Sequence, residues 1–118
     1  MALFHITSHA MWAAAQRAGA YRPPSLDTEQ FIHLSDERQW LATANRFYRG
    51  RRDLVLLAIR EDRLAAPVRW EPADGQHFPH LYGPLELAAV VEVFALPVAA
   101  DGAIEAPPEL ARLGHQQV

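Results

Sequence analysis

Two histidines of the 118-residue chain stand beside hydroxyl residues at the same spacing. His5 precedes Thr7, and His33 precedes Ser35, each within a short apolar run typical of a strand. Alternate residues of a strand point to the same face, so each pair can offer an imidazole and a hydroxyl to one sugar or phosphate. A single strand histidine is most often a half-buried residue with one satisfied hydrogen bond. The repeated pattern is what favours a binding or catalytic site.

A third segment, residues 77–85, contains His77 and His80. With a carboxylate such as Glu71 they would supply the imidazole and carboxylate ligands that zinc accepts. Pro79 between the two histidines argues against a regular ligand helix, and the chain has no His-Glu-x-x-His motif. It has no cysteine for a thiolate site either. We therefore expect no bound metal, with a metal-dependent histidine enzyme as an alternative.

Four further residue types complete the candidate set. Glu71 ends a short predicted strand, where it could act as a general base or bind ribose hydroxyls; the alternative is a surface glutamate. Tyr82 opens the tight turn Tyr-Gly-Pro, and Ser25 can cap a helical turn. Arg46 belongs to a basic patch that could hold a phosphate or simply be a solvated helix end. The other arginines of that patch are Arg49, Arg51 and Arg52.

Composition limits the function classes. The formal net charge is −3, so we expect no general nucleic-acid binding, while an RNA substrate stays open as an alternative. No run approaches the roughly 20 apolar residues of a membrane-spanning helix, and no signal peptide is evident. The lack of cysteine is compatible with a reducing cytosol, and we expect a cytoplasmic protein.

The order of predicted elements indicates one α+β domain with a mixed or split sheet and two main helices. Strands are expected over residues 2–7, 31–34, 53–60 and 68–71, with extended segments at 81–85 and 88–96. Helices are expected over 8–18 and 36–49, the second capped by Ser35, with a helical turn at 25–30 and a short helix at 108–113. Residues 20–24 and 72–75 are expected to be loops. We place the domain at residues 1–98 and a tail at 99–118.

Several motifs, taken in order, resemble the DUF952 family of small bacterial proteins, whose function is unknown. The resemblance covers about residues 2–96, and the motifs are His5–Thr7, Tyr21–Leu26, Phe31–Ser35, Asn45–Tyr48, Asp53–Leu57, Arg69–Glu71 and Phe78–Leu85.

The family looks similar to the ADP-ribosyltransferase fold, a split sheet that clasps NAD, and to RNA 2′-phosphotransferases. That resemblance implies that His5 contacts the NAD ribose and that His33 or Ser35 lies near the nicotinamide. His5-Ile-Thr7 lacks the glycine of the usual His-Gly-Thr. The place of the catalytic glutamate could be taken by Glu71, or instead by His80 or Tyr82. The implied catalytic residues are His33, Ser35, Glu71 and His80, and the implied cofactor-binding residues are His5, Thr7, Ser25, Arg46 and Tyr82.

The resulting hypothesis is an NAD- or nucleotide-related ADP-ribosyl- or phosphotransferase, and the rival is a non-catalytic nucleotide-binding module.

Overall fold

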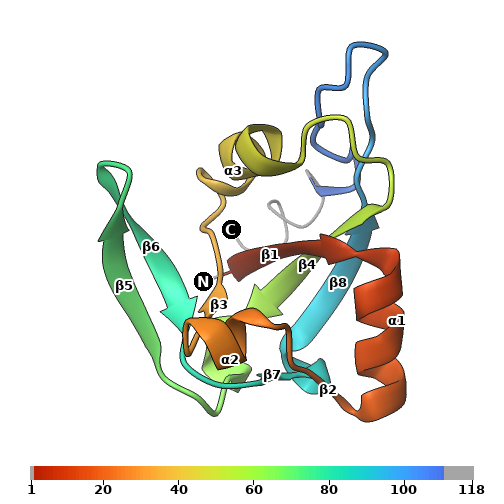
Figure 1. The fold of residues 1–118 in the computed structure, drawn as a ribbon. Coiled ribbons are helices and arrows are strands. Elements are labelled where there is room, and N and C mark those ends of the chain that lie inside the picture. Colours follow the sequence, from red (N-terminus) through yellow and green to blue (C-terminus); the bar gives the residue numbers. More distant parts are fainter. Residues whose placement is uncertain (1, 111–118) are drawn as a thin grey trace.

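A three-stranded antiparallel sheet forms the centre of the computed structural model, which describes residues 2–110 (Figure 1). Strand β4 (Leu54–Arg60) lies between β1 (Ala2–Ser8) and β8 (Val90–Ala95). The apolar run of β4 is buried from Leu54 to Ile59, as expected for a strand that is covered on both faces.

A second antiparallel sheet has the order β3-β6-β5, formed by β3 (Ile32–His33), β6 (Gln76–Leu81) and β5 (Val68–Ala73). The predicted loop at 72–75 is wrong in part, because β5 continues to Ala73. Only Asp74 and Gly75 form the turn, with φ of 53° and 79°. Two successive positive φ angles characterise the tight hairpin turn that Asp-Gly favours.

Strand β6 was not predicted, because Pro79 cannot donate to a strand ladder. Its carbonyl still accepts a hydrogen bond from the Leu34 backbone at 3.0 Å. In a hydrogen-bonded antiparallel pair, Pro79 would also donate to Leu34, and only this one bond is lost. Strand β3 ends at His33, so the proline lies where pairing with β3 is already ending.

An isolated bridge connects the central sheet to the segment that follows β3, in the split arrangement expected from the sequence. Phe4 and Ser35 form an isolated antiparallel bridge with two backbone hydrogen bonds of 2.8 Å. A third, two-stranded sheet is formed by β2 (Ala20–Tyr21) and β7 (Leu85–Glu86). Strand β2 lies within residues 20–24, which were predicted to be a loop. Within residues 2–110 every pairing between named strands is antiparallel.

Helix α1 (His9–Ala18) begins as predicted, with the Ser8 hydroxyl accepting from the Met11 backbone at 3.1 Å. Gly19 ends it with φ of 90°. A single turn, α2 (Ser25–Thr28), precedes β3, and short 3₁₀ turns, η1 (Glu61–Arg63) and η2 (Leu87–Ala89), precede β5 and β8.

Helix α3 (Trp40–Tyr48) starts four residues later than predicted. Ser35 is not its cap, because the Ser35 backbone is paired with Phe4. Residues 36–39 instead form a turn in which Asp36 accepts from the Arg38 backbone at 2.8 Å, and Gln39 accepts from the Asp36 backbone at 3.0 Å. The sequence pattern identified the helix but placed its start in a segment that forms this turn before the helix begins.

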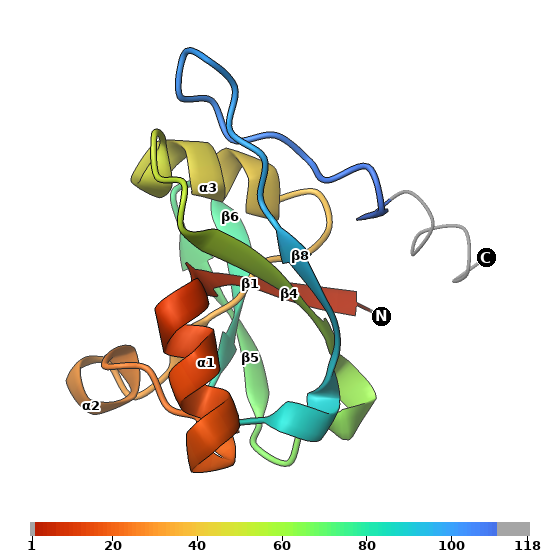
Figure 2. The same ribbon diagram turned by 90° about the vertical axis from the view of Figure 1, so that its right-hand side faces the viewer.

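The two faces of the central sheet are covered by different helices. Ala15 of α1 packs in one core cluster with Leu57 of β4, and Trp40 of α3 packs in a second cluster with Leu56. The segment after β8 runs back beside α3 (Figure 2), where Ile104 is buried and exchanges hydrogen bonds of 2.8 and 2.9 Å with Asn45. Part of the helix predicted at 108–113 lies outside the described residues. Within residues 2–110, no helix has the length and apolar character needed to cross a membrane.

Candidate functional site

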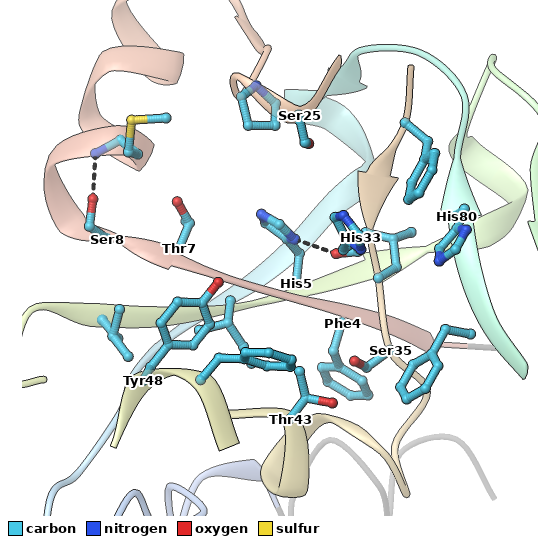
Figure 3. Close-up of a pocket in the computed structure, with 18 of the residues that line it drawn as sticks. Phe4, His5, Thr7, Ser8, Ser25, His33, Ser35, Thr43, Tyr48 and His80 are labelled. Carbon is cyan, nitrogen blue, oxygen red and sulfur yellow. Dashed lines mark hydrogen bonds between the residues drawn. The ribbon is translucent and has the colours of Figure 1, made fainter. Parts of the chain in front are cut away.

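A cleft of about 700 Å³ lies between β1, β3, the start of α1, helix α3 and the tip of the β5–β6 hairpin. Figure 3 shows His5 and His33 at its centre, Thr7 and Ser8 toward α1, and His80 on the far side. Six of the candidate residues line it, namely His5, Thr7, Ser25, His33, Ser35 and His80. Arg46, Glu71 and Tyr82 are not among the lining residues. The strand pairing brings the three histidine segments together, because His33 pairs with His80 and Ser35 forms a bridge to β1.

His5 is held by hydrogen bonds at both ring nitrogens. Its Nδ1 is 2.7 Å from the carbonyl oxygen of His33, and its Nε2 is 2.8 Å from the hydroxyl of Tyr21. Burial lowers the pKa of His5 to about 4, so the imidazole is neutral near pH 7. A carbonyl can only accept, so Nδ1 carries the proton and Nε2 accepts from Tyr21. Neither ring nitrogen is then left for a ligand.

The Tyr21 hydroxyl also lies 2.9 Å from the Thr7 hydroxyl. Tyr21 has one hydroxyl proton, and neutral His5 takes it, so Thr7 must be the donor in the contact between the two hydroxyls. Burial also raises the pKa of Tyr21, which keeps that proton in place. The result is a directed chain from Thr7 through Tyr21 to His5. It commits the Thr7 proton and leaves the two lone pairs of the Thr7 oxygen as acceptors at the cleft wall.

His80 is oriented by a carboxylate that stands behind it. Its Nδ1 lies 2.8 Å from Glu71, which also accepts a hydrogen bond from the Tyr82 hydroxyl. The Tyr82 hydroxyl, and then His80, lower the pKa of Glu71, so the carboxylate is ionised near neutral pH. A carboxylate only accepts, so Nδ1 carries a proton, and in the neutral ring Nε2 is the nitrogen that can accept. The Phe31 ring stacks on His80 with centroids 4.0 Å apart and fixes the plane of the imidazole.

His33 is more exposed than the other two cleft histidines. Its Nε2 is 2.8 Å from Glu29, and about half of each side chain is exposed, at 55% and 49%. It shares a face with Phe31, as the strand alternation predicts, with ring centroids 4.7 Å apart. His33 thus contributes a side chain at the rim and a backbone carbonyl on the floor.

Three of the four arginines in the basic patch are paired with acids. Arg46 is 2.6 Å from Asp74, at the hairpin tip, and Arg49 is 3.3 Å from Asp101. Arg51 makes two bonds to Asp53, at 3.0 and 2.6 Å. Among residues 2–110 there is no cluster of three or more His, Cys, Asp or Glu placed to hold a metal ion, and His77 does not line the cleft.

Sequence reasoning missed two residues of this site. Tyr21 is only 3% exposed, and its partners lie 14 and 16 residues away, so its place in the motif Tyr21–Leu26 does not reveal its hydrogen bonds. Phe47 lines the cleft with 62% of its surface exposed. In the sequence, Phe47 stands within the motif Asn45–Tyr48, and that place was the available signal.

The molecule is a small α+β domain with an aromatic, histidine-lined cleft, and comparisons with known proteins place it in a family. The family described as "Protein of unknown function (DUF952)" matches residues 6–93, and the chain belongs to that family. It is similar to the crystal structure of protein CC0527 from Caulobacter crescentus, with 34% identity, a TM-score of 0.84, and coverage of 97% of this chain and 99% of the other. The solution NMR structure of CC0527 gives 35% identity, a TM-score of 0.76 and coverage of 97% of both chains. No curated protein matched the chain.

Proposed function

We propose that the cleft binds a nucleotide through its base and ribose, with NAD as the first ligand to test and ADP-ribosyl transfer as the reaction class. One observation carries the proposal: imidazole and hydroxyl groups from three distant segments meet in one aromatic cleft. Such a mixture of apolar walls and a few oriented polar groups is typical of small-molecule sites. The resemblance to the ADP-ribosyltransferase fold points to the same ligand class.

The ribose would be held by oriented hydroxyls rather than by His5 itself. The Thr7 oxygen, whose proton is committed to Tyr21, accepts a hydrogen bond from a ribose hydroxyl. Ser25 and Ser35 also line the cleft and can each donate or accept. Orienting the ribose in this way fixes the carbon that loses nicotinamide relative to the attacking group.

His80 is the group placed to remove a proton. In the transfer step, the carbon–nitrogen bond to nicotinamide breaks, and its electron pair goes to the nicotinamide ring. The oxygen of a hydroxyl acceptor, or of water, forms the new bond to the ribose carbon, and its proton moves to Nε2 of His80. Glu71 stabilises the imidazolium that results, because it already accepts the Nδ1 proton.

The second candidate is a nucleotide-binding module without turnover. It is favoured by the position of Glu71, which lies behind His80 and does not line the cleft. A carboxylate in that position cannot contact the ribose carbon as positive charge develops there.

Thermal unfolding with NAD, combined with an assay for released nicotinamide, tests both candidates. Saturation at a hundred times the dissociation constant stabilises a folded protein by about 2.7 kcal/mol, so we expect the melting temperature to rise by several degrees. For an enzyme, His80→Gln should reduce nicotinamide release at least tenfold and change NAD affinity less than twofold. Val91→Ala, on β8 and outside the cleft, is the control.

A thermal shift with no nicotinamide release from the wild type would identify the module. No shift with millimolar NAD, NADP or ADP-ribose would reject nucleotide binding.

A further inference from the structure

The charged groups around the cleft neutralise one another. Arg51 is the one arginine among the described residues that line it, and its guanidinium is held by Asp53 through two hydrogen bonds. Asp74 also lines the cleft, where its carboxylate is paired with Arg46. An incoming phosphate would meet no unpaired guanidinium there, and it would meet a carboxylate at the hairpin tip. Oriented, unpaired donors are what phosphate recognition needs.

The histidines do not supply the missing positive charge. Burial lowers the pKa of His5 to about 4, so it carries no charge near pH 7. His33 is already bonded to Glu29, and His80 is bonded to Glu71. The chain contains no lysine that could compensate.

The cleft also carries exposed apolar side chains. Five large hydrophobic residues in the described part of the chain are exposed, and two of them, Phe47 and Met11, line the cleft. Phe47 is 62% exposed, and the Arg46 guanidinium lies 5.1 Å from its ring centroid. A flat ring that stacked on Phe47 would bury aromatic surface that the free protein leaves in water.

We infer that the cleft recognises the base and ribose of its ligand and leaves the phosphates in solvent, so that the ligand class is a nucleoside unit. The inference rests on the nucleotide-binding function proposed above and names which part of the nucleotide is read. It also distinguishes this cleft from a dinucleotide site, whose affinity depends on phosphate contacts.

Calorimetric titration of the full chain tests the inference with four probes: NAD, nicotinamide riboside, adenosine and inorganic pyrophosphate. At least one nucleoside should bind within fivefold of NAD, and pyrophosphate should not bind. Raising the salt from 50 to 300 mM should change the affinity of NAD less than twofold, because no net charge pair forms. The two nucleosides show which half of NAD the cleft takes.

Three variants complete the test. Phe47→Ala should weaken NAD and the bound nucleoside equally, by about tenfold, while the control Val91→Ala should change neither. Arg51→Gln should leave both affinities within twofold of the wild type. All three positions are exposed, so the folded state should persist.

NAD binding more than fivefold tighter than both nucleosides would overturn the inference while leaving nucleotide binding intact. An advantage of that size that disappeared in Arg51→Gln would locate the phosphate contact. Binding by none of the probes would instead reject the proposed function itself.

Discussion

Replacing Tyr21 with phenylalanine tests the hydrogen-bonded chain on the floor of the cleft. The substitution keeps the ring, which is 3% exposed, and removes only the hydroxyl. That hydroxyl bonds His5 at 2.8 Å and Thr7 at 2.9 Å. Two groups would therefore lose their partner at once, without the formation of a large cavity.

The expected cost follows from those two bonds. A buried hydrogen bond contributes about 1 kcal/mol, and leaving a buried partner unsatisfied costs about 1–3 kcal/mol. Thr7 can turn its hydroxyl toward the cleft and recover part of the loss, whereas Nε2 of His5 cannot move while Nδ1 holds the His33 carbonyl. We expect Tyr21→Phe to lower the free energy of unfolding by about 2 kcal/mol and the melting temperature by roughly 8 °C.

Urea unfolding at pH 7.5 measures this loss, with Tyr48→Phe as the matched control. Tyr48 lines the same cleft, and none of the hydrogen bonds found among the described residues involves its hydroxyl, so the control should change stability by less than about 0.5 kcal/mol. Nitrogen NMR of the wild type at pH 7 should show His5 protonated at Nδ1 only. A Tyr21→Phe loss no larger than that of the control, or a His5 proton on Nε2, would refute the directed chain.

Two further predictions concern pH and the C-terminal segment. The pKa of His5 is about 4 in the folded protein against about 6.5 in the unfolded chain, so the unfolded chain takes up the proton first as the pH falls. Stability should decrease between pH 6.5 and 4 by up to about 1.4 kcal/mol per unit, and urea unfolding of His5→Gln should lack this part of the slope. Asn45→Ala should lower the free energy of unfolding in urea by about 1–3 kcal/mol, because both backbone groups of buried Ile104 lose their partners. Arg49→Ala removes an exposed ion pair and should lower it by less than about 0.5 kcal/mol. Equal losses for Asn45→Ala and Arg49→Ala would show that the segment contributes nothing through Asn45.

Elements whose causes are local could be predicted from the sequence. Residues 54–59 of β4 form a continuous apolar run, and the Ser8 cap and Gly19 end of α1 are set by neighbouring residues. Elements that depend on a distant partner could not. Strand β2 exists because Tyr21 pairs with Leu85, and Ser35 does not cap α3 because it pairs with Phe4.

The same distinction applies to the site. Strand alternation correctly placed Phe31 and His33 on one face, since that relation spans two residues. The contact of His80 with Glu71 needs the register of the β5–β6 hairpin, and the pattern around Pro79 concealed that hairpin. The sequence identified polar residues of the cleft. It could not show which hydrogen bonds these residues make, such as the bond from His80 to Glu71 outside the cleft lining.

Strand β3 connects the parts of the cleft although only two of its residues are assigned to the strand. Beyond it, Ser35 pairs with β1, while His33 pairs with His80 of β6, so this short segment sets the distance between the first and third histidine segments. Its backbone does more than space them, because the carbonyl of His33 is the acceptor that fixes the tautomer of His5. Whether the Thr7 hydroxyl donates or accepts toward the cleft therefore depends on the distant main-chain carbonyl of His33. The effect passes through His5 and Tyr21. Strand β3 holds this carbonyl in place because it pairs with β6 and, through Ser35, with β1. A shift of either strand would change the hydrogen bond between the His33 carbonyl and His5.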